Sequence, residues 1–311
     1  MENGVSSGNT AQRHMTPPRH TPYAGPSRPF TIGLGALNPD EWIEKEPDLN
    51  RYLNEKHRLW SENAGLVFQA EDDTDKAQQE TLDALVRHLL QTQPETYTQS
   101  GSVIRAGQHA IDLNDGTLPP LAKAGFLVAD DLVIMRKKEA GWSLVAAHLS
   151  FPSSWSLAEK FGHTMDEIHG PVPGFAAGTR NASLISRMFD NLSTPVWRMN
   201  WSLNPNDQLF LPKPKVGHNQ TLQPPYTPER IFLRIERQSL TRLPVSRDIV
   251  FTIRIHVDPL SALLNHEQAE TLGNKLADQV EELDDIRIMY KGIAHNHREL
   301  VAIFRNFAKN R

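Results

Sequence analysis

The residues best suited to chemistry begin with a single histidine, His169, in the stretch IHGPVPGF. Pro171 and Pro173 follow it, and each proline fixes its own φ angle and pushes the preceding residue toward an extended conformation. The histidine is therefore held by a stiff backbone. An imidazole restrained in this way is suited to ligate a metal. The plainer alternative is that it caps the preceding helix or bonds a carbonyl group.

Two other patterns resemble a metal site and a dinucleotide site, and neither meets the requirements of such a site. His295 and His297 in IAHNHREL are two residues apart, and on a helix such side chains point in different directions, so no shared metal ion is expected there. Gly33 and Gly35 form a Gly-x-Gly pair. They lack the third glycine and the following apolar helix of a dinucleotide site, so a turn is expected instead.

Composition limits the classes of protein and of site. The 311 residues include no cysteine, which excludes disulfides, thiolate zinc sites, iron–sulfur clusters and covalently attached haem. The net charge of -4 argues against a nucleic-acid partner. No apolar run approaches the ~18 residues that cross a bilayer, and the amino terminus lacks a secretory pattern. We expect a cytoplasmic protein without a membrane partner.

Apolar spacing predicts the elements that must position His169. Residues 1–29, rich in Ser, Pro, Gly and Asn, are expected to form a disordered tail. Apolar residues at helical intervals predict four amphipathic helices, over residues 39–63, 75–95, 154–168 and 181–193. His169 therefore follows directly on a helix.

Short apolar runs predict the strands. The short apolar runs between roughly 118 and 150 read as a hairpin that turns at 139–141. After a Pro-rich connection over 204–228, strict alternation predicts two more strands, with Ile231, Leu233 and Ile235 on one face and Arg234 and Glu236 on the other. A long helical tract from residue 259 closes the chain. The sequence thus predicts an α+β fold, with one domain over residues 30–311 and helical extensions at both ends.

Three blocks carry a resemblance to a known family: SFPSSWSLAEKFGHTMDEIHGPVPG, RMNWSL and LRIERQSLTRLPVSRDIVFTIR. They resemble the haem-dependent oxidative N-demethylase alpha-subunit-like proteins over residues 30–305. The resemblance implies a PAS-like fold, in which an antiparallel sheet flanked by helices encloses a b-type haem. It also implies that O2 is used to oxidise a methyl group of a small secondary amine such as dimethylamine, releasing formaldehyde. Electrons would come from NADPH through a separate reductase with flavin and an iron–sulfur centre.

Given this resemblance, His169 is the expected axial ligand of the haem iron. Haem iron takes a His, Cys, Met or Tyr ligand, cysteine is missing, and a restrained histidine is a suitable donor. Three other histidines are rivals. His148 ends an apolar strand, His163 follows Gly162 at an expected helix end, and His256 lies on the polar face of a strand.

Haem propionates are carboxylates, which arginine binds through charge-assisted hydrogen bonds. The candidates are Arg234, Arg237, Arg242 and Arg254, and we favour Arg237 and Arg242 within the third block. The alternative for any one of them is a cross-strand ion pair with Glu236.

Glu236 and two tryptophans are the expected substrate residues. A secondary amine is protonated at neutral pH, and a carboxylate could hold or deprotonate it. Glu236 could equally be an ion-pair partner of Arg254 or Arg237. Trp155 and Trp201 are expected to form the apolar wall of a haem or amine pocket, because an indole face attracts a cation. Most buried tryptophans are simply core.

The predicted function is the catalytic subunit of a haem-dependent oxidative N-demethylase of the monooxygenase class, working with a separate reductase. The alternative is a PAS-like haem-binding sensor or binding module without catalysis, because a fold alone does not give function. A third reading is a haem-free relative. Sensors usually carry a fused output domain, and the closing helical tract is too short for one, which favours the enzyme. The oligomeric state stays open.

Overall fold

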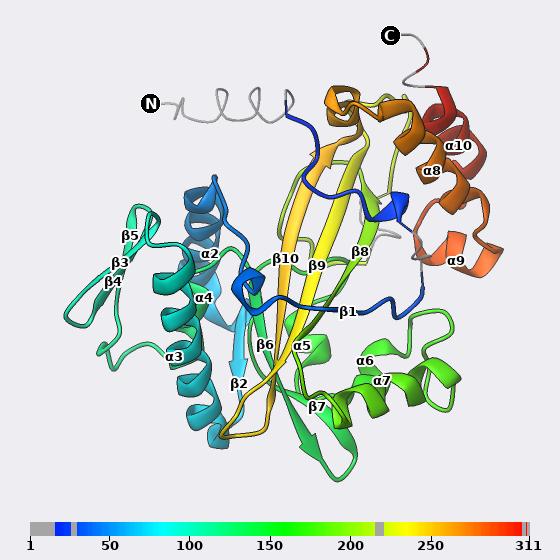
Figure 1. Ribbon diagram of the computed structural model, residues 1–311. Coiled ribbons are helices and arrows are strands. Elements are labelled where there is room, and N and C mark those ends of the chain that lie inside the picture. The colour runs from blue at the N-terminus through cyan, green and yellow to red at the C-terminus, as the bar shows by residue number, and fades with distance from the viewer. Residues whose placement is uncertain (1–15, 26–29, 215–220, 307–308, 310–311) are drawn as a thin grey trace.

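The computed structural model describes residues 16–25, 30–214, 221–306 and 309. Its centre is a seven-stranded antiparallel sheet with the order β1-β8-β9-β10-β6-β7-β2 (Figure 1). The strands of this sheet are β1 Gly35–Ala36, β2 Phe68–Ala70, β6 Asp131–Lys138, β7 Gly141–His148, β8 Val196–Asn204, β9 Phe232–Arg242 and β10 Ile249–Pro259. A separate three-stranded sheet contains β3 Tyr97–Ser100, β4 Val103–Ala106 and β5 His109–Asp112.

The two antiparallel pairs expected from the sequence are confirmed. β6 and β7 form the first hairpin, with the turn at the expected Gly141. β9 and β10 pair along eleven residues, from Phe232 opposite Pro259 to Arg242 opposite Ile249. Four strand regions were not predicted: β8, β3 to β5, β1 and β2. β8 pairs with β9 from Phe232 to Leu240, and β3 to β5 lie in a stretch that had no assignment. Gly35, expected in a turn, lies in β1 opposite Trp197 of β8, and the start of the expected hairpin region forms a helix, α4 Pro120–Gly125.

The helices follow the predicted periodicity with different ends. The α-helices are α2 Leu49–Asn63, α3 Asp75–Thr92, α4 Pro120–Gly125, α5 Leu157–Lys160, α6 Met165–His169, α7 Arg180–Asp190, α8 Ala269–Glu281, α9 Asp285–Tyr290 and α10 His297–Asn306. The 3-10 turns are η1 Pro22–Ala24, η2 Pro39–Glu41, η3 Ala64–Leu66, η4 Asp72–Thr74 and η5 Leu260–Asn265. The first helix begins at Leu49 rather than at residue 39, because Pro47 disfavours the helical conformation of the residue before it.

The helix expected over 154–168 is two short helices. Gly162 has a φ of 78°, a left-handed conformation that interrupts a helix and that glycine adopts without steric cost. Each half has its own capping box, Ser156 with Glu159 in α5 and Thr164 with Glu167 in α6. A capping box satisfies the free amide groups at a helix start. α6 is therefore an independent turn that ends at His169. The extended conformation expected before Pro171 is wrong, because Gly170 is helical, with φ -47° and ψ -41°; glycine has no Cβ to clash with the proline ring.

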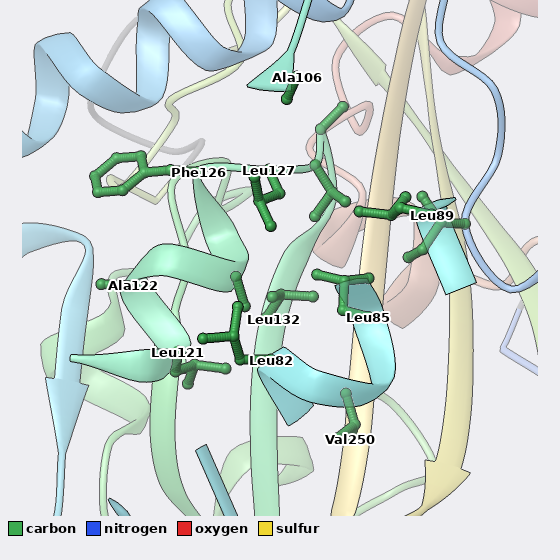
Figure 2. Close-up of a cluster of buried hydrophobic side chains, with 14 of the residues drawn as sticks. Leu82, Leu85, Leu89, Ala106, Leu121, Ala122, Phe126, Leu127, Leu132 and Val250 are labelled. Carbon is green, nitrogen blue, oxygen red and sulfur yellow. The ribbon is translucent and has the colours of Figure 1, made fainter. Parts of the chain in front are cut away.

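Helices cover both faces of the sheet. α3 and α4 pack on one face, where leucines of α3 meet the end of α4 and strands β6 and β10 (Figure 2). α5, α6 and α7 lie on the other face, at the lower right in Figure 1, with Phe175, Ile185 and Phe189 buried against β6, β7 and β10. α8 to α10 close a third apolar cluster around Leu272, Leu276 and other apolar side chains.

The chain ends differ from their expectations. The closing tract is interrupted, since η5, α8, α9 and α10 are separate elements. Part of the expected tail lies outside the described residues, whereas residues 16–25 lie against the domain. Tyr23 is 1% exposed and packs edge-on against Trp201, with ring centroids 6.2 Å apart. Among the described residues, no helix has the length and apolar character that crossing a bilayer requires.

Two arginines expected on a polar face are completely buried. Arg234 and Arg254 are each 0% exposed. Arg234 donates to the carbonyl oxygens of Phe151 (2.7 Å) and Leu209 (3.2 Å). Arg254 pairs with Glu46 and lies over the Tyr52 ring. Helices and loops cover both sides of β9 and β10, so alternation did not give a solvated face; buried charges persist because each is paired or hydrogen-bonded.

Candidate functional site

His169 is the last residue of α6 and is half-buried. Its Nδ1 atom lies 3.0 Å from the carbonyl oxygen of Met165, one helical turn earlier. With Nδ1–H donating to this carbonyl, Nε2 keeps its lone pair for a metal, which is the arrangement by which proteins orient metal-binding histidines. Burial lowers the pKa of His169, so the ring is neutral near pH 7. The sequence offered ligation and carbonyl bonding as alternatives, and this geometry permits both.

Polar side chains of two strands lie on the same sheet face. Arg198 is directly opposite Gln238, and Asn200 is opposite Glu236, across the β8–β9 pair. Directly opposite residues project to the same side of an antiparallel pair. Gln238 donates to Glu236 through a 3.1 Å hydrogen bond. The pair of strands thus presents a cation, a carboxylate and two amides together.

Arg198 links this face to His169. Its positive charge adds to the burial that lowers the pKa of His169. Burial also lowers the pKa of Arg198, against the opposing effect of Glu236. The Nε atom of Arg198 is buried and has no hydrogen-bond partner within the described residues. A buried unpaired guanidinium nitrogen costs free energy unless a ligand pairs with it.

Apolar side chains of the same segment pack against the sheet. Trp155, Met165, Ile168 and Val172 are partly buried against the cluster under the sheet. The His169 and Phe175 rings lie 6.1 Å apart. Trp155 thus packs against the same apolar cluster as the residues of α6, and its place in a pocket stays a prediction.

A cavity of about 400 Å³ lies along β8, within the range of roughly 300–1,000 Å³ that small-molecule sites occupy. Its lining includes Arg198, Asn200 and Trp201 from β8, together with Phe30 and Thr31. Arg198 therefore lines this cavity and also lies close enough to His169 for its charge to add to the burial that lowers the pKa of that ring.

Trp201 lies on the other face of β8. It is 4% exposed, and its indole nitrogen donates to Gln279 (3.0 Å). The Nζ atom of Lys291 lies 4.3 Å from the centre of its ring, so a cation of the protein already occupies one indole face. Burial lowers the pKa of Lys291 to about 8, and Glu236 opposes this shift. Sequence reasoning did not find Lys291.

The donors of the favoured arginines are already engaged. Arg237 donates to the carbonyl oxygens of Glu41 (2.6 Å) and Trp42 (3.2 Å), and it projects from β9 to the face opposite Glu236. Arg242 donates to the carbonyl oxygens of Leu192 (2.8 Å), Arg247 (3.0 Å) and Phe189. Both side chains thus tie neighbouring segments to the sheet.

Arg198 was missed because the RMNWSL block had no element assigned to it. Alternation of Arg198 and Asn200 with Met199 and Trp201 was the available signal for a strand with one polar face.

The rival histidines lie in other surroundings. His148 is 0% exposed between Phe126 and Trp60. His163 has a side chain that is 51% exposed and lies 3.4 Å from Glu167. His256 bonds to Glu44 on the opposite sheet face (2.9 Å). Of the four histidines, His169 alone combines an oriented ring, apolar neighbours and a buried unpaired guanidinium nearby.

This donor set fits a haem. One oriented imidazole, an apolar wall and an unpaired buried arginine are the groups that an iron porphyrin with carboxylate side chains requires. The fold is α+β, with helices on both faces of one large antiparallel sheet, and one of these faces carries the candidate donors. Residues 33–301 match the family described as haem-dependent oxidative N-demethylase, alpha subunit-like. The chain belongs to this family, whose chemistry is oxidative and haem-dependent and whose alpha-subunit character implies further subunits.

Proposed function

We propose that the chain is the catalytic subunit of an oxidative N-demethylase that binds b-type haem through Nε2 of His169. The observation that carries this proposal is the bond between Nδ1 of His169 and the carbonyl oxygen of Met165. It fixes the ring and leaves one nitrogen for the iron. Family membership supports the haem dependence.

Arg198 is the proposed partner of a haem propionate. Its buried Nε lacks a partner within the described part of the chain, and a carboxylate would satisfy it through a charge-assisted bond. Arg237 and Arg242 contribute instead by holding their backbone partners in place, since their donors are engaged.

Glu236 is the proposed anchor of the substrate ammonium. The charge of Glu236 acts on three buried or partly buried cations, Arg198, Arg234 and Lys291, and these would oppose a further cation. When Arg198 pairs with a propionate, the negative charge of Glu236 becomes available to the amine. Trp155, which packs against the apolar cluster of this sheet face, is the proposed apolar wall of the amine pocket. Trp201 lines the neighbouring cavity, although Lys291 covers part of its ring.

Bound haem would supply the activation of O2. The overall reaction balances when one O2, two electrons and two protons convert the N-methyl amine into the demethylated amine, formaldehyde and water. The electrons would come from NADPH through a separate flavin and iron–sulfur reductase. In this chain, Glu236 orients the ammonium, and the apolar side chains around His169 exclude water from the reacting methyl group.

The PAS-like assignment rests on the arrangement of strands and helices. β6 to β10 are five consecutive strands of one antiparallel sheet, and α5, α6 and α7 are inserted between β7 and β8. These helices lie over one sheet face, and the proposed haem ligand ends the second of them (Figure 1).

The test is reconstitution of the purified chain with haemin, followed by its Soret band. His169→Ala should abolish or strongly weaken haem binding while the circular dichroism spectrum is unchanged. His163→Ala is the matched control, because that ring is exposed and lies six residues earlier in the same segment. An unchanged Soret band in His169→Ala would refute the ligand assignment.

The catalytic part needs a separate readout. With a surrogate reductase and O2, the haem-loaded chain should release formaldehyde from dimethylamine. Full haem loading and confirmed reduction without formaldehyde from any of a panel of methylated amines would favour a haem sensor or binding module. Failure to bind haem at all would instead favour a haem-free relative.

A further inference from the structure

Three ligand-type side chains from distant parts of the chain meet on the sheet face opposite Glu236. His20 lies in the segment 16–25, Glu44 lies between η2 and α2, and His256 lies in β10. One donor atom from each lies within 4.8 Å of the others. Nε2 of His20 is 2.8 Å from Oε1 of Glu44, and Nε2 of His256 is 2.9 Å from Oε2 of the same carboxylate.

We propose that His20, Glu44 and His256 bind one divalent transition-metal ion of the Zn²⁺ type. Two imidazole nitrogens and one carboxylate form the ligand set that proteins use for Zn²⁺ with one position left for water. Tetrahedral Zn²⁺ holds its ligand atoms about 2.0–2.1 Å away. The two Nε2 atoms contact the two oxygens of Glu44, so an ion would replace these hydrogen bonds after small side-chain movements, with each ring carrying its proton on Nδ1 instead.

The three side chains are largely buried and held in place by their contacts. The exposed fractions of the side chains are 17% for His20, 8% for Glu44 and 10% for His256. Both Nε2 atoms contact the Glu44 carboxylate, and the two rings meet edge to face with centroids 4.9 Å apart. The greater exposure of His20 provides the entry side for the ion.

Two neighbouring arginines should weaken the binding of a metal ion. Nε of Arg19 lies 3.4 Å from Oε1 of Glu44, and Nε of Arg237 lies 3.8 Å from the same oxygen. Their charges oppose a divalent cation, so binding should be weaker than in a site of the same ligands without arginines. Arg19 is partly exposed and can turn away from Glu44 when the ion enters.

The site is independent of the proposed haem pocket. His256 is opposite Ile235 in the β9–β10 pair, so it projects from the face that carries Arg237 and away from Glu236. A metal here would fasten residues 16–25 to β10. Its role would be to hold the segment that carries Tyr23 against the cluster around Trp201.

The first test is Zn²⁺ titration of the chelator-treated full chain by calorimetry, with the bound metal counted by mass spectrometry. Wild type should take up one ion per chain with saturation. His20→Ala should lose this uptake, and His256→Gln should reduce it at least tenfold. His295→Ala is the matched control, because His295 is exposed outside the cluster, and its uptake should equal that of wild type.

The second readout is proteolysis. Trypsin cleaves after Arg19, next to His20, so Zn²⁺ should slow this cut in wild type and not in His20→Ala. His20 lies at the edge of the domain, and its variant should keep the wild-type circular dichroism spectrum. No saturable uptake by wild type, or equal uptake by wild type and His20→Ala, would overturn the proposal.

Discussion

A Cβ atom added at Gly125 would lie 1.9 Å from Nδ1 of His148. Gly125 ends α4, and its missing side chain lets the imidazole of β7 lie directly against the helix. The ring is fully buried, 4.9 Å from the ring of Phe126 between centroids. Neither ring nitrogen has a hydrogen-bond partner in the part of the chain that the structure describes. The close approach therefore fixes a neutral histidine inside the core.

Gly125→Ala should destabilise the domain by about 3 kcal/mol, because a buried ring in a dense core has no room to move away from the new methyl group. Urea unfolding followed by circular dichroism measures this. Gly116→Ala is the control, since a Cβ there meets nothing within 4 Å. Equal stability of the two variants would contradict the packing argument.

Because of His148, the free energy of unfolding should decrease as the pH falls below about 6.5. Burial holds its folded-state pKa well below 6.5, so the unfolded chain binds a proton that the folded chain does not. The stability is present above pH 6.5 and declines as the pH falls, by up to about 1.4 kcal/mol per pH unit.

Urea unfolding at pH 7.5 and pH 6 tests this dependence, with His148→Leu expected to show the smaller loss. Measurements stay at or above pH 6 because burial raises the pKa of Asp131 to about 6. A raised carboxyl pKa acts in the opposite direction, as the folded state then holds the extra proton at lower pH. His295→Gln should show the same decrease in unfolding free energy between pH 7.5 and pH 6 as wild type. An equally large decrease in His148→Leu would show that His148 is not the group responsible.

Arg198→Met should weaken haem binding about tenfold or more, because it removes the proposed propionate partner while keeping most of the side-chain length. Arg242→Met is the matched control. Its lost bonds to Leu192 and Phe189 should lower the melting temperature without a comparable loss of haem affinity. Haemin titration and thermal unfolding separate the two effects. The reverse pattern would restore Arg242 as the propionate ligand.

Glu236→Gln should slow formaldehyde release at least tenfold while haem affinity changes little, because the substitution removes charge and keeps volume. Formaldehyde release at saturating amine, beside haemin titration, measures both quantities. Quaternary amines, which have no removable proton, should be poor substrates of wild type. Full activity of Glu236→Gln would remove this residue from the proposed mechanism.

The isolated chain should not accept electrons directly from NADPH. Its sequence has no dinucleotide fingerprint and no cysteine for an iron–sulfur centre. Stopped-flow spectra of the haem-loaded chain should show reduction only after a reductase is added. Fast reduction by NADPH alone would contradict the need for a partner.

The sequence by itself determined the elements whose cause is local. The leucines of α3 recur at helical spacing, and the helix ends before Pro94. The β6–β7 turn follows from Gly141, and the position of His169 at the end of α6 follows from the capping box of Thr164 and Glu167. Each of these features depends on residues within one or two turns of chain, where propensity and periodicity act directly. The three blocks also sufficed for the family, which the match over residues 33–301 confirms.

Only the tertiary structure decided which charged residues face which site. Strand alternation placed Arg234 on the polar face of its strand, but loops from other parts of the chain bury it. Besides burial, the charge of Arg198, rather than that of Arg237, lowers the pKa of His169. The strand register places the two arginines on opposite faces of the sheet, and α6 packs on the face of Arg198. His20, Glu44 and His256 meet only once three remote segments are packed together. Local sequence fixes the conformation of a segment, whereas contacts between remote segments depend on the packing of the whole chain.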